Sequence, residues 1–110
     1  MNSLLQTAIQ AAVTAGEEIL KIYDDPASDF EVEQKADHSP LTIADRKSND
    51  IIMEYLKNTS YPVISEETKI IAYEERKNWP VVWIVDPLDG TKEFIKRNGE
   101  FTVNIALTYE

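Results

Sequence analysis

The chain has no cysteine, which excludes disulfide bonds and thiol chemistry and suits a reducing compartment. Residues 1–16 carry no charge and mix apolar with polar side chains, so a basic segment and a continuous apolar run are both missing there. We therefore expect neither a signal peptide nor a membrane-spanning segment. The expected location is the cytoplasm, with peripheral attachment to the cytoplasmic face of the inner membrane as the alternative.

Basic residues are scarce, with 11 Lys and Arg against 20 Asp and Glu and a formal net charge of −9. This balance argues against a nucleic-acid polymer or an anionic membrane as the main partner. A small polyanion can still bind where metal ions and local basic residues reverse the field. The length of 110 residues allows one domain at most.

The apolar pattern predicts two long helices, over residues 3–24 and 42–56, the second capped by Thr42. It predicts strands at residues 62–65 and 81–85 and an alternating, half-buried, antiparallel strand at 101–109. We expect the whole apolar stripe of the first helix to be core, and it comprises Leu4, Leu5, Ala8, Ile9, Ala12, Val13, Ile19, Leu20 and Tyr23. No internal repeat or linker divides the chain.

The most informative stretch follows the apolar run at residues 81–85, which reads as a strand buried on both faces. Asp86 and Asp89 stand where that strand is expected to end, around a proline that cannot donate to a ladder. A short helix at 91–98, closed by Gly99, is expected next. Carboxylates hold Mg²⁺ and the free N–H groups of a helix start hold phosphate, so this stretch favours metal-assisted phosphoryl chemistry.

Two other interpretations compete with this one. A D-x-x-D pattern beside proline and glycine is most often a turn with a helix cap. A phospho-aspartate mechanism needs D-x-D-x-T, with the second acid two residues on and the threonine four. Here Asp89 and Thr91 lie three and five residues beyond Asp86, so we reject that mechanism.

A second acid follows the strand at 62–65 in the same way, because Glu66 comes directly after Ser65. If the two strands are neighbours in a sheet, Glu66 and Asp86 emerge side by side, and their repulsion is relieved by a cation such as Mg²⁺. Glu67 competes equally with Glu66 for this role.

Further residues carry open alternatives. Asp45, in the first turn of the second helix, either complements the helix dipole or takes part in the site. Thr91 either only begins a helix or orients a water. The basic residues Lys92, Lys96 and Arg97 form either a solvated face or a surface that steers phosphate.

Three segments of the chain resemble motifs of the inositol monophosphatase superfamily and occur in the same order. They are KADHSPLTIAD (35–45), SEE (65–67) and WIVDPLDGT (83–91). The continuation KEFIKRNGEFTVNIAL (92–107) is similar to the bacterial 3′(2′),5′-bisphosphate nucleotidases within that superfamily. The resemblance implies an α+β fold, the N-terminal part of a layered sugar-phosphatase fold with helices packed on a mainly antiparallel sheet.

The resemblance also implies roles for residues. It makes Glu66, Asp86 and the carbonyl of Leu88 ligands of a first Mg²⁺, and Asp86 and Asp89 ligands of a second. A third, weaker metal position, often linked with lithium inhibition, would lie near Asp45. The remaining implied roles are substrate binding by Glu66, Leu88, Asp89, Gly90 and Thr91, and catalysis by Glu66, Thr91 and Asp45.

The implied activity is Mg²⁺-dependent removal of the 3′-phosphate from adenosine 3′,5′-bisphosphate. The alternatives are an inositol-phosphate or sugar-phosphate phosphatase and a non-catalytic module that binds metal or phosphate. Members of the superfamily are more than twice as long, and their second half supplies a further metal-binding aspartate and most base and sugar contacts. We therefore expect residues 1–110 to be an N-terminal part that is inactive alone.

Overall fold

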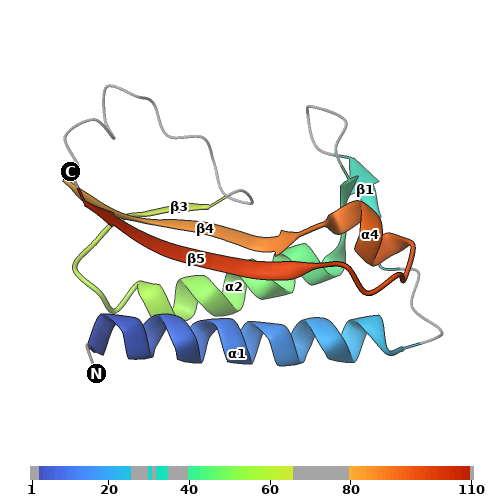
Figure 1. Cartoon of the computed structure of the whole chain (residues 1–110), viewed down its shortest axis with the longest axis horizontal. Helices are drawn as coiled ribbons and strands as arrows, with labels where there is room; N and C mark the ends of the chain where they lie inside the picture. The colour runs from blue at the N-terminus through green and yellow to red at the C-terminus, as the bar shows by residue number, and fades with distance from the viewer. Residues whose placement is uncertain (1–2, 26–29, 31, 35–39, 66–79, 110) are drawn as a thin grey trace.

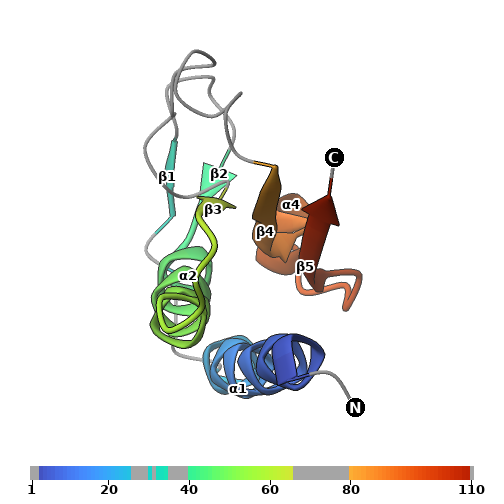
Figure 2. The same cartoon turned by 90° about the vertical axis from the view of Figure 1, so that its left-hand side faces the viewer.

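The computed structural model describes residues 3–25, 30, 32–34, 40–65 and 80–109. Helices α1 and α2 form one layer, and the strands β3, β4 and β5 form a sheet that lies on it (Figures 1 and 2). The short elements β1, β2 and α4 gather at one end of these layers (Figure 1). The elements in chain order are α1 (Ser3–Tyr23), β1 (Glu33–Gln34), β2 (Pro40–Leu41), α2 (Ile43–Leu56), β3 (Val63–Ser65), β4 (Val81–Asp89), α4 (Thr91–Ile95) and β5 (Thr102–Tyr109).

Helix α1 lies where the apolar periodicity predicted it, but its buried face is narrower than expected. Its fully buried residues are Ala11, Ala15 and Ile19, four residues apart in sequence. The expectation that the whole apolar stripe is core is wrong, because Leu5, Ile9, Val13 and Leu20 are 44–55% exposed. Two of the three buried positions are alanines, which let α1 pack closely against its neighbours, and the apolar sector of α1 is wider than the face that is covered.

Helix α2 begins at the predicted cap. The backbone N–H of Thr42 donates to Oδ2 of Asp45 at 2.9 Å, and Thr42 Oγ1 accepts the backbone N–H of Asp45 in return. This capping box satisfies donors that have no partner within the helix. The helix therefore starts at a fixed residue, which sets the faces on which all later side chains of α2 lie.

The sheet has the order β3–β4–β5, with β3 parallel to β4 and β4 antiparallel to β5. The condition set for the two acid-bearing strands is met, since β3 and β4 are neighbours and Ser65, the last residue of β3, lies opposite Val85. Two expectations for β4 are wrong. The strand continues through Asp89, and Ile84 is 47% exposed on the face opposite the helices. A short apolar run cannot by itself show how many faces are covered.

Two apolar clusters fill the space between the layers. One is aliphatic apart from Trp83 and comprises Ala11, Ala15, Ile52, Leu56, Trp83 and Val85. The other surrounds Phe94 near α4 and comprises Ile19, Phe30, Ala44, Leu88 and Phe94. No helix within the described ranges has the length and hydropathy needed to cross a bilayer.

Candidate functional site

A β-bulge in β4 shapes the candidate site. Asp86 lies opposite Asn104, and the next recorded pair is Asp89 with Thr102. Three steps along β4 therefore match two steps along β5, so β4 holds one extra residue between the pairs. Pro87 lies within this irregular stretch, where a regular ladder bond is not required, and this explains how the strand continues past a proline.

The bulge brings the two aspartates to one face of the sheet. Residues three apart in a regular strand point to opposite faces, whereas residues opposite each other in a pair share a face. Asn104 and Thr102 are two apart and share a face, so Asp86 and Asp89 share it with them. The amide of Asn104 donates to Asp89 Oδ2 at 3.4 Å and to Thr102 Oγ1 at 3.3 Å, as this placement requires.

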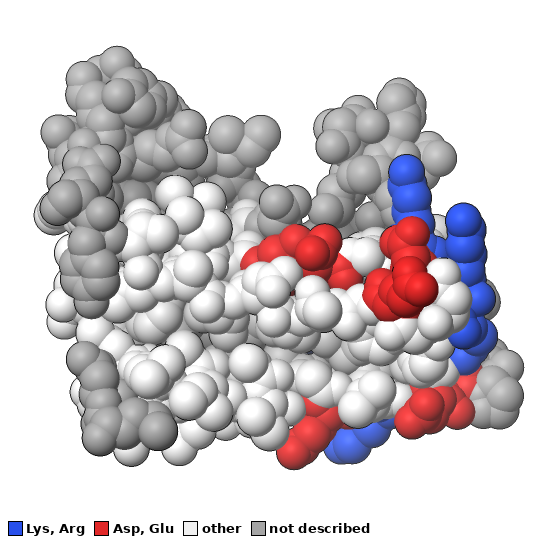
Figure 3. All heavy atoms as spheres, in the orientation of Figure 1, with Lys and Arg blue, Asp and Glu red and all other residues white. Residues whose placement is uncertain are grey.

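This face of the sheet is open and acidic. Asp86 and Asn104 line a groove of about 420 Å³ whose other walls are mainly aliphatic, including Ile84 and Ala106. Figure 3 shows acidic side chains gathered over this part of the surface, with basic side chains beside them at the α4 end. Two carboxylates on one face and the carbonyl of Leu88 in the same turn are hard oxygen donors of the kind that Mg²⁺ prefers. The donor set therefore fits Mg²⁺.

Thr91 and Asp45 meet beside this face, although 46 residues separate them in sequence. Thr91 Oγ1 donates to Asp45 Oδ1 at 2.9 Å and lies 3.3 Å from the carbonyl oxygen of Leu88. Asp45 is fully buried, and its Oδ2 accepts from both the backbone N–H and the hydroxyl of Thr42. Asp45 thus does more than complement the helix dipole, because it accepts a hydrogen bond from Thr91, for which the Leu88 carbonyl is a second, more distant acceptor.

Two further polar residues of α2 reach the site. Ser48 Oγ donates to the carbonyl oxygen of Pro87 at 2.6 Å, and Asn49 Oδ1 accepts from Ser65 Oγ at 2.6 Å. Sequence reasoning missed both residues. The signal was available, because Asp45, Ser48 and Asn49 occupy the inward positions that precede Ile52 at helical spacing.

Gly90 joins β4 to α4 in a conformation that other residues rarely adopt. Its φ is +90°, and a Cβ added there would lie 2.6 Å from the carbonyl oxygen of Glu100. The strand-to-helix turn that presents Thr91 therefore requires glycine both for its backbone angle and for space.

The helix after Gly90 is shorter than predicted, since α4 ends at Ile95 and Gly99 does not cap it. Arg97 takes the left-handed position instead, with φ of 58°. Its N–H bonds to the Phe94 carbonyl at 3.0 Å, and the N–H of Asn98 bonds to the Glu93 carbonyl at 3.3 Å. This pair of bonds is a Schellman ending, which glycine usually provides.

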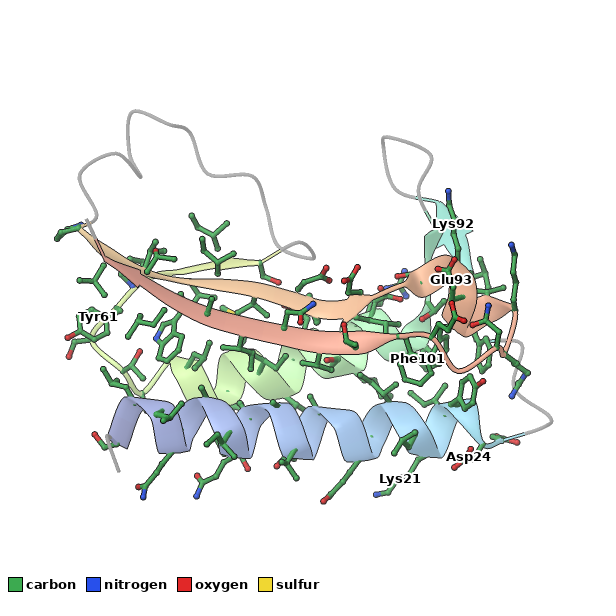
Figure 4. All side chains as sticks on the ribbon, viewed as in Figure 1. Lys21, Asp24, Tyr61, Lys92, Glu93 and Phe101 are labelled. Atoms are coloured by element: carbon green, nitrogen blue, oxygen red, sulfur yellow. The ribbon has the colours of Figure 1, made fainter. Side chains whose placement is uncertain are left out.

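Arg97 fits neither expectation for the basic residues. Its guanidinium donates to the backbone carbonyls of Tyr23 and Asp25 and lies 4.2 Å from the centre of the Phe30 ring. These contacts hold the end of α1 against α4 and help to offset the strained φ of Arg97. Lys92 and Lys96 remain exposed, and Lys92 extends from α4 away from the helix layer (Figure 4).

Several predicted site residues lie outside the described part of the chain. Glu66 and its competitor Glu67 are among them, as are residues 35–39 of the first motif. Within the ranges that the structure describes, no group of three or more Asp, Glu, His or Cys is placed to hold a metal. Of the metal ligands that the sequence predicted, those within the described ranges are Asp86, Asp89 and the Leu88 carbonyl.

Comparison with known proteins gives a consistent result. The model of the inositol monophosphatase family matches residues 1–110. The chain is 49% identical over 106 residues to the 3′(2′),5′-bisphosphate nucleotidase CysQ of Escherichia coli, covering 94% of this chain and 42% of that protein. Against CysQ of Haemophilus influenzae, the identity is 39% over 106 residues, covering 94% and 38%. The chain therefore spans about two fifths of the length of these relatives.

Solved structures share the fold. CysQ from Bacteroides thetaiotaomicron, described as a bacterial member of the inositol monophosphatase family, superposes with a TM-score of 0.84 at 62% identity, over 97% of this chain and 38% of that one. The extragenic suppressor protein suhB from Bartonella henselae gives a TM-score of 0.82 at 30% identity, over 98% and 41%. The layered arrangement of helices and sheet is thus shared with these solved structures.

Proposed function

The chain belongs to the inositol monophosphatase family, and on that basis we propose that the complete protein is a Mg²⁺-dependent phosphomonoesterase. We propose adenosine 3′,5′-bisphosphate as its substrate and the 3′-phosphate as the group removed, because CysQ relatives at about 50% identity carry the name 3′(2′),5′-bisphosphate nucleotidase. The observation that carries the site assignment is the bulge that brings Asp86 and Asp89 to one face of the sheet.

In this proposal Asp86, Asp89 and the Leu88 carbonyl hold Mg²⁺, and Glu66 contributes a further carboxylate. Bound Mg²⁺ would lower the pKa of a coordinated water and offset the charge of the phosphate. The aspartates supply oxygen ligands on an open face, where the phosphate of a small molecule has access. The number of metal ions is part of the proposal, with two in the complete site and a third, weaker position near Asp45.

Thr91 has the role of orienting the attacking water. Because its proton is directed to Asp45, its Oγ1 has lone pairs left to accept a hydrogen bond from that water. Asp45 is a buried carboxylate with three hydrogen-bond donors around it, so this orientation is fixed before substrate binds. The backbone N–H groups after Gly90 supply donors for phosphate oxygens in the same turn.

The test uses the complete protein. We expect phosphate release from adenosine 3′,5′-bisphosphate to exceed release from inositol phosphate and from a sugar phosphate, and to stop when a chelator removes Mg²⁺. Faster release from inositol phosphate or a sugar phosphate would replace the proposed substrate and leave the metal site standing. Mg²⁺ binding without turnover of any of them would favour a non-catalytic binding module, and undiminished activity after chelation would overturn the metal site.

A further inference from the structure

The inward face of α2 is polar where it meets the candidate site and apolar farther along the helix. Its first two turns present Asp45, Ser48 and Asn49 to the sheet, and we name these three residues the polar row. All three are buried, with exposures of 0%, 0% and 8%. The later inward positions on the same helix are Ile52 and Leu56, which pack in the aliphatic cluster.

Each member of the polar row bonds to a different segment of the site. Asp45 accepts from Thr91 at the start of α4, at 2.9 Å. Ser48 and Asn49 hold the bulge of β4 and the last residue of β3, each at 2.6 Å. Three segments far apart in the sequence are therefore bound to two consecutive turns of one helix, whose own start is fixed by the Thr42 cap.

Packing of α2 against the sheet does not by itself require polar side chains at the positions of the polar row. Burial of a polar group costs free energy unless it is hydrogen-bonded, and apolar residues one turn later on α2 pack against the same sheet without that cost. Every buried side-chain nitrogen and oxygen within the described ranges has a partner. What the polar row adds over apolar packing is direction, because hydrogen bonds fix orientation and apolar contacts do not.

The hydrogen bond from Ser48 is made to a part of β4 where the regular ladder of backbone hydrogen bonds is interrupted. Pro87 has no N–H, and the bulge interrupts the ladder between Asp86 and Asp89. The Ser48 hydroxyl holds the Pro87 carbonyl and thereby fixes the peptide plane between Pro87 and Leu88. That plane lies between the two aspartates and immediately before the Leu88 carbonyl.

We propose that Ser48 and Asn49 are positioning residues for the metal site, a role that rests on the proposed function. Ser48 fixes the orientation of the turn that carries Asp86, the Leu88 carbonyl and Asp89. Asn49 fixes Ser65, the residue that directly precedes Glu66 in the sequence. Groups that orient metal ligands without touching the metal typically alter metal affinity about 10- to 100-fold when they are removed.

The experiment compares two ends of the same helix in the complete protein. The test variants are Ser48→Ala and Asn49→Ala. The control is Thr59→Val, which removes a hydroxyl that accepts from Trp83 Nε1 at 3.0 Å and donates to the Leu56 carbonyl at 2.7 Å, at the far end of α2. For each protein, Mg²⁺ affinity is measured by calorimetry without substrate, and stability is measured by urea unfolding without Mg²⁺.

We expect Ser48→Ala and Asn49→Ala to weaken Mg²⁺ binding about 10-fold or more. Thr59→Val should lower stability yet keep Mg²⁺ affinity within about twofold of wild type, since its hydroxyl bonds far from the donors. Ser48→Thr, which keeps the hydroxyl, should recover most of the affinity lost in Ser48→Ala. If Asn49→Ala does not fold, Ser65→Ala removes the same bond from the strand side and should weaken binding to a similar extent. If Ser48→Ala does not fold, Ser48→Cys replaces the hydroxyl with a weak S–H donor and should also weaken binding.

The proposal is overturned if the test variants lose stability and bind Mg²⁺ as wild type does, because the polar row would then be purely structural. It is also overturned if Thr59→Val weakens Mg²⁺ binding as much as they do. Failure of the proposed function has a different signature and is seen in the wild-type protein, which would then bind Mg²⁺ without releasing phosphate or bind no Mg²⁺ at all.

Discussion

The two ends of the helix–sheet layer are built in different ways. At the end where β3 begins, α2 meets the sheet through Ile52 and Leu56, which pack with Trp83 and residues of α1. At the other end the same helix meets the sheet through the buried polar row, next to a bulge and a left-handed glycine. At the first end the contacts of α2 with the sheet are apolar and non-directional, whereas at the other end short, directional hydrogen bonds act beside the apolar cluster around Phe94.

This difference indicates a division of roles. Apolar packing tolerates small shifts of one layer on the other, whereas a metal site requires its donors to be held within fractions of an ångström. The cluster around Phe94 lies at the end that carries the polar row, and there the ring centres of Tyr23, Phe94 and Phe101 are 5.0–5.3 Å apart. Phe101 lies between the start of β5 and α1 (Figure 4). We therefore expect substitutions at the two ends to separate stability from chemistry.

The largest expected effect is at the aliphatic end. Leu56→Ala removes a fully buried side chain from the core, and it should lower the free energy of unfolding of the complete protein by about 3–5 kcal/mol. Urea unfolding measures this loss. Phosphate release per folded molecule should stay within a few-fold of wild type, and a selective loss of turnover would contradict the division between the ends.

Asp86→Asn should have the opposite effect to Leu56→Ala, with a large loss of turnover and little loss of stability. It removes a negative charge from the face that Asp86 and Asp89 share, and, if Asp86 holds Mg²⁺ as proposed, turnover at saturating Mg²⁺ should fall about 100-fold or more. The matched control is Asp50→Asn on the exposed side of α2, which should have little effect on turnover. Activity of Asp86→Asn within a few-fold of wild type would remove Asp86 from the metal site.

Thr91→Ala, at the same end, tests the proposal that the Thr91 hydroxyl orients the attacking water. We expect kcat to fall about 10- to 100-fold with a smaller change in KM, because the hydroxyl acts on the nucleophile and not on bound substrate. Thr91→Ser keeps the oxygen that bonds to Asp45 and should recover most of kcat. A raised KM with unchanged kcat would make Thr91 a substrate-binding residue.

Arg97→Gln should affect stability without affecting chemistry. It breaks the bonds to the Tyr23 and Asp25 carbonyls and the contact with the Phe30 ring, so we expect a loss of about 1 kcal/mol, reduced by solvent screening at this exposed position. The neighbouring exposed Lys96→Gln is the control and should leave the urea midpoint unchanged. Equal midpoints for the two variants would show that the Arg97 contacts do not stabilise the fold.

The smallest expected effect is at the exposed lysines. Neutralising Lys92 and Lys96 together should weaken binding of a nucleoside bisphosphate about two- to fivefold and that of a monophosphate less, because the bisphosphate carries a second anionic group. The difference should shrink as salt is added. The measurement is KM for both substrates across a salt series. An equal rise of KM for the two substrates would show that the lysines are simply solvated and do not steer phosphate.

Local features of the chain were predictable from its sequence. The cap at Thr42, the alternation from Phe101 to Tyr109 and the acids that follow apolar runs are each contained within a few consecutive residues. They depend on backbone geometry and on the periods of 3.6 and 2 residues. The parallel pairing of β3 with β4 was only a condition in the sequence argument, and the structure supplies it.

Other features depended on contacts between distant residues, and only the tertiary structure decided them. The bulge that brings Asp86 and Asp89 to one face is defined by the register with β5, and a sequence spacing of three predicts opposite faces for a regular strand. The bond from Thr91 to Asp45 spans 46 residues, and those of Ser48 and Asn49 span 39 and 16. Periodicity predicts that a residue faces inward, but which group it meets there is set by the packing of layers.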